Sequence, residues 1–408
     1  MSNRRTFLGS VIGGAAGVAV AATATGTAAT GRVVGANDRI RFGLIGGGSR
    51  GKEIFRAALR CSNVEPAAVA DIYTRRHGEV KAIAPGIATY KDHRALLDDK
   101  SIDAVLIATP QHLHAQHFVA AIQAGKDVYQ EKTMAFCPAH ARRMQSALAG
   151  SGRVVQVGMQ MNSGQGLRQV RERATTETMG TITLLQTHHF RNSLYGGWRR
   201  EIPPDCDLAH VDWTAFQGDA KAVPFDPQRF INWRFFWDYS GGNVFENMVH
   251  TLGFWLAGLD LPIPPSVTMT GANFLAPRMQ VPDTFQVTMS YPGKLLFTFT
   301  SMFGNSYYGE GHDLLFGTRA TLIHTQSDQV NVIPQGSHSA ARGGADEGGY
   351  KEMTDLHMQN FFDCMRSRKD PICPFELGFR TAITCQMAIA SYRRQATVRW
   401  DPGTEEIL

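Results

Sequence analysis

Two residues that could move a proton stand far apart in the chain. Lys132 follows the run Asp127-Val128-Tyr129-Gln130, so it lies at the end of an expected strand. His250 lies four residues after Glu246, and residues at that spacing share one face of a helix. A reaction at a substrate hydroxyl group needs a base for its proton and a hydrogen-bond donor that stabilises the charge left on the oxygen. Lys132 and His250 suit these tasks, and we expect Glu246 to orient the imidazole and stabilise its charged form.

A glycine-rich turn near the start of the fold could hold phosphates. Residues Ile40 to Ile45 read as a short strand that runs directly into a G-x-G-x-x-G pattern. Gly46 allows the tight turn, Gly48 lets the backbone approach phosphates, and Gly51 lets the next helix pack while its N-terminus faces the anion. The residues expected to hold a dinucleotide here are Gly46, Gly48, Ser49, Arg50 and Gly51.

An acidic residue follows the second expected strand. Val64 to Ala70 ends at Asp71, about 20 residues after the glycines, where a carboxylate grips the ribose 2′-hydroxyl of a dinucleotide. Asp71 repels a 2′-phosphate, which favours NAD over NADP. Arg75 and Arg76 follow closely and could pair with that phosphate, so NADP stays open.

The segment from Ile40 to about Val157 alternates short β-branched strands with helical stretches. Such alternation predicts right-handed βαβ units, a parallel sheet and ligands at the carboxyl ends of the strands. We assign residues 38–158 to a Rossmann NAD(P)-binding domain. The strands expected after the first two are Ala104–Ala108, Asp127–Gln130 and Val154–Val157.

Beyond Gly158 the pattern changes. Period-two alternation in Phe285–Tyr291 and Leu295–Met302, with Pro-Gly-Lys between them, predicts a hairpin in an antiparallel sheet with one solvated face. Met353–Arg366 and Leu377–Tyr392 read as helices that return to the body of the protein. The expected fold is therefore α/β, with an N-terminal Rossmann domain and, over 159–408, a substrate-binding α+β domain with a large, mostly antiparallel sheet.

The first thirty residues read as a leader. Asn3-Arg4-Arg5-Thr6-Phe7-Leu8 matches a twin-arginine export signal, and the Gly/Ala run that follows is too short at its apolar core for a stable membrane span. We expect residues 1–30 to be a signal peptide and the mature protein to be periplasmic or otherwise exported. Losing them lowers the formal charge from +5 to +3. This mild charge, with no basic cluster, argues against nucleic acid as a partner.

Neither cysteine nor histidine spacing predicts a metal. The six cysteines lie far apart, with no C-x-x-C pair, so we expect buried thiols and leave any disulfide pairing open. His112, His114 and His117 lie close together, but no cysteine or carboxylate completes a set nearby.

Three stretches resemble the glucose-fructose oxidoreductase/inositol dehydrogenase/MocA (Gfo/Idh/MocA) family. They are the glycine turn with Ile107–His114, the strand Ala124–Thr133 that ends in Glu-Lys, and Gly241–His250. The likeness covers nearly all of residues 38–408 and implies an NAD(P)-dependent oxidoreductase. The cofactor-binding residues that it implies are Thr109, Pro110, His114 near the nicotinamide, Glu131 and Lys132.

The chain departs from that family pattern at three positions. Thr133 replaces a proline, Glu246 replaces an aspartate, and Gly253 stands where an aspartate often follows the histidine. The retained histidine keeps proton transfer plausible, while the substrate geometry set by the missing carboxylate is open.

Aromatic and arginine residues are dense between Arg191 and Trp237. Sugars stack on aromatic rings and accept hydrogen bonds from arginine, so part of this stretch is expected to line a cleft for a carbohydrate. The candidate substrate-binding residues are Lys132, Arg191, Trp233, Arg234 and His250.

Export constrains the mechanism, because free NAD is scarce outside the cytoplasm. We expect a tightly bound NAD that is recycled in place while a secondary hydroxyl of a sugar, glycoside or related polyol is oxidised. The alternative is a redox-neutral NAD-dependent glycoside hydrolase that uses transient oxidation and elimination; a nucleotide-retaining sugar-binding protein is a third class. A homo-oligomer through the C-terminal sheet is also expected.

Overall fold

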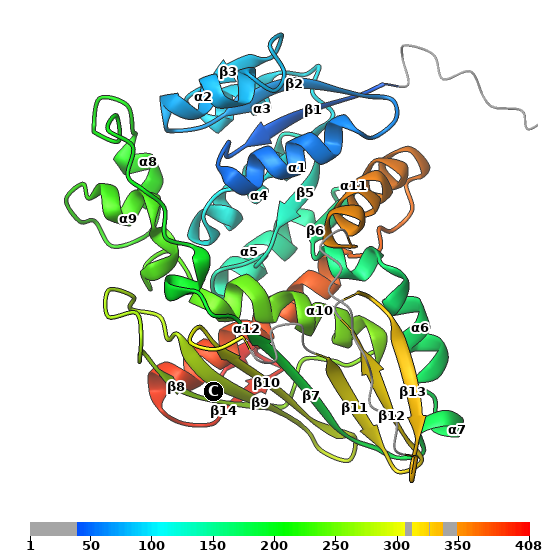
Figure 1. The fold of residues 1–408 in the computed structure, drawn as a ribbon. Coiled ribbons are helices and arrows are strands. Elements are labelled where there is room, and N and C mark those ends of the chain that lie inside the picture. Colours follow the sequence, from blue (N-terminus) through cyan, green and yellow to red (C-terminus); the bar gives the residue numbers. More distant parts are fainter. Residues whose placement is uncertain (1–38, 307–311, 326, 338–348) are drawn as a thin grey trace, which may run out of the picture.

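A six-stranded parallel sheet organises the N-terminal domain of the computed structural model, which describes residues 39–306, 312–325, 327–337 and 349–408 (Figure 1). The strand order is β3-β2-β1-β4-β5-β6, the doubly wound arrangement predicted from the sequence. The expected signal peptide lies outside the described residues. The strands are β1 (Ile40–Ile45), β2 (Val64–Ala70), β3 (Ala88–Tyr90), β4 (Ala104–Ile107), β5 (Asp127–Glu131) and β6 (Val155–Gly158).

Helices cover this sheet because their apolar residues recur on one side. In α1 the residues Ile54, Phe55 and Ala58 are buried, while Glu53 and Arg56 are exposed. The helices of this domain are α1 (Ser49–Leu59), α2 (Thr74–Lys81), α3 (His93–Asp98), α4 (His114–Gln123) and α5 (Pro138–Leu148), with the short η2 (Gln111–Leu113).

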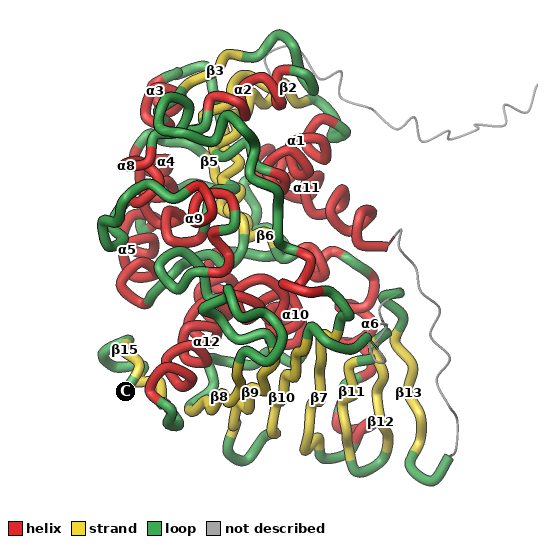
Figure 2. The backbone as a smooth tube through the Cα atoms, turned by 60° about the vertical axis from the view of Figure 1, so that its left-hand side comes forward, coloured by secondary structure: helices red, strands yellow, loops and turns green. Residues whose placement is uncertain are grey.

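A nine-stranded sheet forms the second domain, in the order β13-β12-β11-β7-β10-β9-β8-β14-β15 (Figure 2). The β7–β10 pair is parallel and its other pairs are antiparallel, so the prediction of a large, mostly antiparallel sheet is confirmed. Alternate residues of β9 are buried, as the period-two pattern indicated. The strands are β7 (Ile182–Phe190), β8 (Ser266–Ala272), β9 (Thr284–Tyr291), β10 (Leu295–Met302), β11 (Asp313–Gly317), β12 (Ala320–His324), β13 (Val330–Pro334), β14 (Val398–Asp401) and β15 (Glu406–Ile407).

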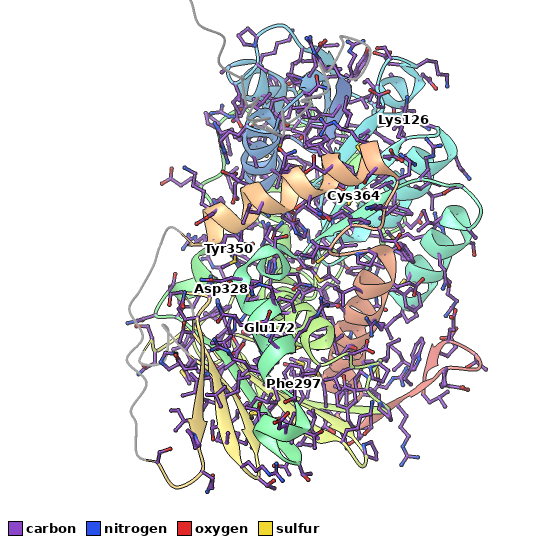
Figure 3. The ribbon with its side chains drawn as sticks, turned by 90° about the vertical axis from the view of Figure 1, so that its right-hand side faces the viewer. Lys126, Glu172, Phe297, Asp328, Tyr350 and Cys364 are labelled. Atoms are coloured by element: carbon purple, nitrogen blue, oxygen red, sulfur yellow. The ribbon has the colours of Figure 1, made fainter. Side chains whose placement is uncertain are left out.

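Two long helices near the C-terminus pack on different sheets. Helix α12 (Phe375–Arg394) lies with α10 (Val249–Gly258) on one face of the nine-stranded sheet. Helix α11 (Gly349–Ser367) instead packs on the Rossmann sheet, where Phe362 meets Phe42 and Phe361 meets Tyr129. Figure 3 shows α11 lying across that domain, from Tyr350 at its start to Cys364 near its end.

The segments between β6 and β8 form much of one side of the molecule and join the two sheets. Tyr73, after β2, pairs as an isolated antiparallel bridge with Val211, so this segment is tied to the Rossmann domain. Its elements are η3 (Gln160–Ser163), α6 (Gln165–Arg173), α7 (Thr176–Met179), η4 (Leu194–Gly197), α8 (Trp213–Gln217), α9 (Pro227–Ile231), η5 (Trp233–Phe235) and the π-helix η6 (Val244–Met248).

The six cysteines are free thiols, four of them buried. Within the described residues, no helix is both long and apolar enough to cross a membrane.

Candidate active site

A cavity of about 1200 Å³ opens at the carboxyl ends of the Rossmann strands. Its walls come from the turns after β1, β2, β4 and β5 on one side and from β7, η5, η6 and α10 on the other. Open parallel sheets bind ligands at this edge, and the volume exceeds that of a typical single-ligand site. The predicted site residues that line it are Gly46, Gly48, Ser49, Arg50, Asp71, Thr109, Pro110, Lys132, Arg191, Trp233, Arg234, Glu246 and His250.

The glycine turn has the shape that a pyrophosphate needs. Gly46 has φ +96°, a conformation that L side chains rarely adopt, and a Cβ on Gly51 would lie 1.9 Å from the Gly46 carbonyl oxygen. A Cβ on Gly48 would meet nothing within 4 Å, so the space beside it is open. The first turn of α1 carries no acidic residue, which keeps its N-terminal N–H groups available to an anion. These residues fit a dinucleotide.

Asp71 lines the cavity and also holds the glycine turn together. Its Oδ2 accepts a hydrogen bond from the Gly47 N–H at 2.7 Å, and its Oδ1 accepts one from the Tyr73 N–H at 2.8 Å. Burial raises the pKa of Asp71, against the effect of these donors and of Arg76. Each oxygen keeps a lone pair for a ribose hydroxyl.

The two arginines that could favour NADP have carboxylate partners. Arg76 pairs with Glu79 at 2.8 Å, and Arg75 pairs with Glu79 at 3.1 Å and with Asp205 at 3.2 Å. A 2′-phosphate would have to compete with these ion pairs and with the nearby Asp71.

At the other end of the cavity the carboxylate of Glu246 contacts side chains from three other segments of the chain. Nζ of Lys132, just after β5, lies 2.7 Å from Oε2 of Glu246 in the π-helix η6. Oε1 of Glu246 accepts a hydrogen bond from Nε2 of Gln111 at 2.8 Å. Nε of Arg234 lies 3.1 Å from the same oxygen, an ion pair without an aligned hydrogen bond. Burial alone would raise the pKa of Glu246, but Arg234 and Lys132 outweigh it and lower the pKa to about 2.

His250 lies beside this cluster, and among the described residues Glu246 forms no hydrogen bond with its imidazole, so the expected orienting contact is absent. Both oxygens of Glu246 are taken by lysine, arginine and amide donors, and the π-helical turn shifts residues four apart off a common line. Among the described residues, His250 Nδ1 has no hydrogen-bond partner. Burial, with Lys132 and Arg50 adding to it, lowers the pKa of His250 well below its ordinary value, while Glu246 acts in the opposite direction and favours the charged form, as expected from the sequence. The net shift favours the neutral imidazole that a base requires.

His250 also touches a residue that sequence reasoning missed. Its ring meets Tyr350, from the start of α11, edge-to-face at 6.0 Å. The Tyr350 hydroxyl donates to Oε1 of Gln160 at 2.9 Å, and Nε2 of Gln160 donates to the Tyr129 hydroxyl at 2.7 Å. Tyr350 therefore links the imidazole to buried polar groups of the Rossmann domain. No local pattern marks it.

Three predicted cofactor residues lie outside the cavity lining. His114 is buried with its ring nitrogens 2.8 and 2.9 Å from the carbonyl oxygens of Thr133 and Thr109, so it lies behind the lining residue Thr109. Glu131 accepts a hydrogen bond from Nε of Arg50 at 2.8 Å and so anchors the turn from behind. Gly51 packs inside the turn, as described above.

A side chain at Gly253, where the family resemblance expects an aspartate, would have to displace Met159. A Cβ there would lie 2.5 Å from Sδ of Met159. The thioether fills this place, so Glu246 serves without a second carboxylate from α10. Among the described residues, no group of three or more His, Cys, Asp or Glu side chains could hold a metal ion.

Comparison with known protein families divides the chain into the same two domains as the structure. Residues 40–159 match the Gfo/Idh/MocA model described as an oxidoreductase family with an NAD-binding Rossmann fold, and residues 214–399 match the C-terminal alpha/beta domain of that oxidoreductase family.

Curated relatives are similar over part of their length. Inositol 2-dehydrogenase 3 of Saccharopolyspora erythraea is 32% identical over 152 residues, which cover 37% of this chain and 45% of that one. An uncharacterized oxidoreductase of Streptococcus pneumoniae is 24% identical over 237 residues, or 57% of this chain and 54% of that one. The chain spans about half the length of the curated relatives that it matches.

Solved structures share the fold. Levoglucosan dehydrogenase in complex with NADH and levoglucosan has a TM-score of 0.66 at 17% identity, covering 88% of this chain and 99% of that one. The WlbA dehydrogenase from Bordetella pertussis, in complex with NADH and UDP-GlcNAcA, has a TM-score of 0.68 at 18% identity, covering 89% and 99%.

Proposed function

Because the chain belongs to the Gfo/Idh/MocA family of oxidoreductases, whose Rossmann domain binds NAD, we propose that it oxidises a secondary hydroxyl of a sugar, glycoside or related polyol. The observation that carries the proposal is the position of Lys132 and a neutral His250 in one cavity, at the strand ends that face a dinucleotide. The side chains of Lys132 and His250 can both form a hydrogen bond with the hydroxyl oxygen of a substrate bound in this cavity.

The reaction balances as follows. The carbinol C–H leaves as hydride, the O–H proton passes to the protein, and a C=O bond forms. A nicotinamide dinucleotide held by the glycine turn and Asp71 would supply the hydride acceptor. His250 takes the proton because its imidazole is neutral. Lys132, held by Glu246, donates a hydrogen bond to the oxygen as negative charge develops on it.

NAD is the proposed cofactor, and NADP is the alternative. Asp71 lines the cavity where a ribose would lie, while Arg75 and Arg76 are paired with carboxylates. We further propose that the enzyme is exported, because residues 3–8 match a twin-arginine signal, and that it keeps its NAD bound between turnovers, because free NAD is scarce outside the cytoplasm.

The direct test is to purify the protein from the exported fraction, denature it and identify any released nucleotide by mass spectrometry. Undenatured protein is then mixed with sugars and aryl glycosides without added NAD. We expect an absorbance change of the bound nicotinamide and formation of a ketone. Nucleotide-free protein that binds NAD only in the millimolar range would contradict retention. Failure of every sugar to change the absorbance with NAD supplied would contradict the activity.

A redox-neutral glycoside hydrolase is the second candidate, favoured by the presence of two separate proton-transfer groups in the cavity. After transient oxidation of a hydroxyl, a base must remove the acidified neighbouring C–H before the aglycone leaves, water adds and the hydride returns. Lys132 and His250 could divide these transfers. Release of aglycone with no net nicotinamide change would favour this candidate over the dehydrogenase.

The open face of the nine-stranded sheet is the proposed contact between copies of the chain. Helices α10 and α12 cover one face, while Leu296, 41% exposed, lies on the other with Thr300 and Met302. Light scattering of the wild type and of Leu296→Glu tests this: a dimer that the substitution dissociates supports the contact, and a wild-type monomer contradicts it.

A further inference from the structure

Arg191 brings a positive charge into the cavity without an acidic partner. It follows β7 directly, lines the cavity and is partly buried. Its Nη1 donates to the Gly196 carbonyl at 2.6 Å, its Nη2 lies 3.0 Å from Nε2 of His189, and its guanidinium lies 6.0 Å from the ring of Trp198. Among the described residues, no carboxylate forms a salt bridge with it. Two of its five donors are used by neutral groups.

Unlike Arg191, the neighbouring cations Lys132 and Arg234 have a carboxylate partner. Lys132 and Arg234 share Glu246, which lies within 3.1 Å of both. Burial lowers the pKa of Arg191, and Glu246 acts in the opposite direction from farther away. The group formed by Lys132, Arg191, Arg234 and Glu246 therefore carries three positive charges and one negative charge. A partly buried charge without a counter-ion is costly, so the cavity favours a ligand that supplies one.

His189 fixes the direction in which Arg191 points. A guanidinium only donates hydrogen bonds, so Nε2 of His189 must accept, which requires a neutral imidazole. Burial, with Arg191 next, lowers the pKa of His189 to about 3, which keeps the ring neutral at physiological pH. The Gly196 carbonyl holds the other end of the guanidinium. The planar donor group is thus held in place before a substrate arrives.

We propose that the sugar substrate carries a carboxylate, as a uronic or aldonic acid does, and that Arg191 pairs with this group. The proposal rests on the proposed function and adds the substrate class. Arg191 lies near enough to Glu246 for the two charges to interact, so one sugar-sized molecule could reach both Arg191 and Lys132. A bidentate guanidinium–carboxylate pair would orient the ring while the reacting hydroxyl faces Lys132 and His250.

The test compares methyl glucuronide, methyl glucoside and glucose 6-phosphate as substrates for wild type, Arg191→Gln and Arg191→Lys. We expect wild type to prefer the glucuronide. Arg191→Gln should raise the KM for the glucuronide about 10- to 100-fold, the range for loss of a charge-assisted hydrogen bond, and should raise the KM for the neutral glucoside by a smaller factor. Arg191→Lys keeps the charge but not the planar guanidinium, so its KM for the glucuronide should lie between those of wild type and Arg191→Gln. Arg168→Gln is the matched control: it removes one charge from an exposed arginine of α6 paired with Glu172.

Calorimetric titration of the nucleotide-loaded protein with the same three compounds decides the inference even where turnover is absent. Tighter binding of the glucuronide by wild type than by Arg191→Gln supports it. Equal affinity for the glucuronide and the glucoside overturns it, as does a preference for the phosphate or an equal loss for all three ligands. Turnover of the glucoside alone would leave the dehydrogenase function standing and the carboxylate inference wrong. Binding of the glucuronide without nicotinamide reduction by any sugar would contradict the dehydrogenase instead.

Discussion

Nζ of Lys132 lies 2.7 Å from Oε2 of Glu246, although 114 residues separate them in the chain. The lysine comes from the end of a Rossmann strand and the glutamate from the π-helix that precedes α10. The side chains are 11% and 7% exposed, so the pair is largely removed from water. A lysine held this way presents its ammonium to the cavity in one orientation, which is what stabilisation of an alkoxide requires.

Replacing Lys132 should therefore lower the rate and leave the nucleotide bound. Lys132→Met keeps the length of the side chain and removes its charge, so we expect kcat to fall by about 10² to 10⁴, the usual contribution of an acid–base group. Steady-state rates and the nucleotide content of the purified variant are the measurements. Retained turnover would mean that another donor serves the substrate oxygen, and lost nucleotide would point to a cofactor role instead.

Protonation of Glu246 at low pH should lower the free energy of unfolding. Its pKa is lowered from 4.5 to about 2, so its contribution to the free energy of unfolding is present above about pH 4.5 and is lost as the pH falls towards 2. Glu246→Gln leaves Lys132 and Arg234 without their counter-charge and should be destabilised by a few kcal/mol at neutral pH. Urea unfolding at several pH values should show the difference from wild type shrinking in acid. A difference that does not change with pH would mean that the carboxylate charge is not the cause.

The parts of this site that sequence spacing predicted are those on the Rossmann strands. Gly46, Asp71 and Lys132 each follow a strand, and parallel strands end at one edge of the sheet, so their proximity follows from the chain order. The partners of Glu246 do not follow in this way, because Gln111 lies 135 residues from it and the pairing depends on how the two domains meet.

The surroundings of His250 were also beyond sequence reasoning. A carboxylate four residues earlier predicted an oriented imidazole, but Glu246 bonds to Lys132 and Gln111 instead, and burial is the largest effect on the pKa of His250. The packing at Gly253 was likewise not predictable. The sequence shows only that an aspartate is missing there, whereas the structure shows that Met159 fills the space.

A neutral His250 predicts a flat pH profile on the acid side. Since its pKa lies well below its ordinary value near 6.5, protonation of His250 should not reduce kcat/KM between about pH 7 and 5. His250→Ala should lower kcat by about 10² to 10⁴ across this range, and the double variant with Lys132→Ala should lose less than the product of the two single losses, because both residues serve one oxygen. An acid limb with a midpoint near 6.5 in wild type, absent from His250→Asn, would show that the imidazole titrates normally.

Asp71 should set the preference between the two dinucleotides. Asp71→Asn removes the charge that repels a 2′-phosphate yet can keep a hydrogen bond with a neighbouring backbone N–H, so the turn is preserved. We expect the ratio of NADPH to NADH affinity to rise by at least about tenfold. Fluorescence titration of the stripped protein with each nucleotide measures this. If wild type already binds NADPH more tightly, Arg75 or Arg76 leaves its carboxylate partner for the phosphate and Asp71 is not the selector.

Protonated His324 should stabilise the wall of the cavity, and this stabilisation should be lost at high pH. Its ring stacks on Phe254 at 4.3 Å, its Nε2 lies 3.0 Å from Oδ1 of Asp328, and its Nδ1 lies 3.6 Å from Oδ2 of Asp313. Burial opposes the charged form, but the two carboxylates outweigh it and raise the pKa from 6.5 to about 9. The stabilisation is therefore complete below about pH 6.5 and is lost as the pH rises through 9.

His324→Gln, neutral at every pH, should thus be less stable than wild type at pH 6, by up to about 3 kcal/mol, with a difference that shrinks as the pH rises to 9. Denaturant unfolding across this range measures it, and His210→Gln, which alters an exposed histidine paired with Asp207, is the control that should change little. If the deficit of His324→Gln stayed constant from pH 6 to 9, it would come from lost packing on Phe254 and not from the charge that the two aspartates hold.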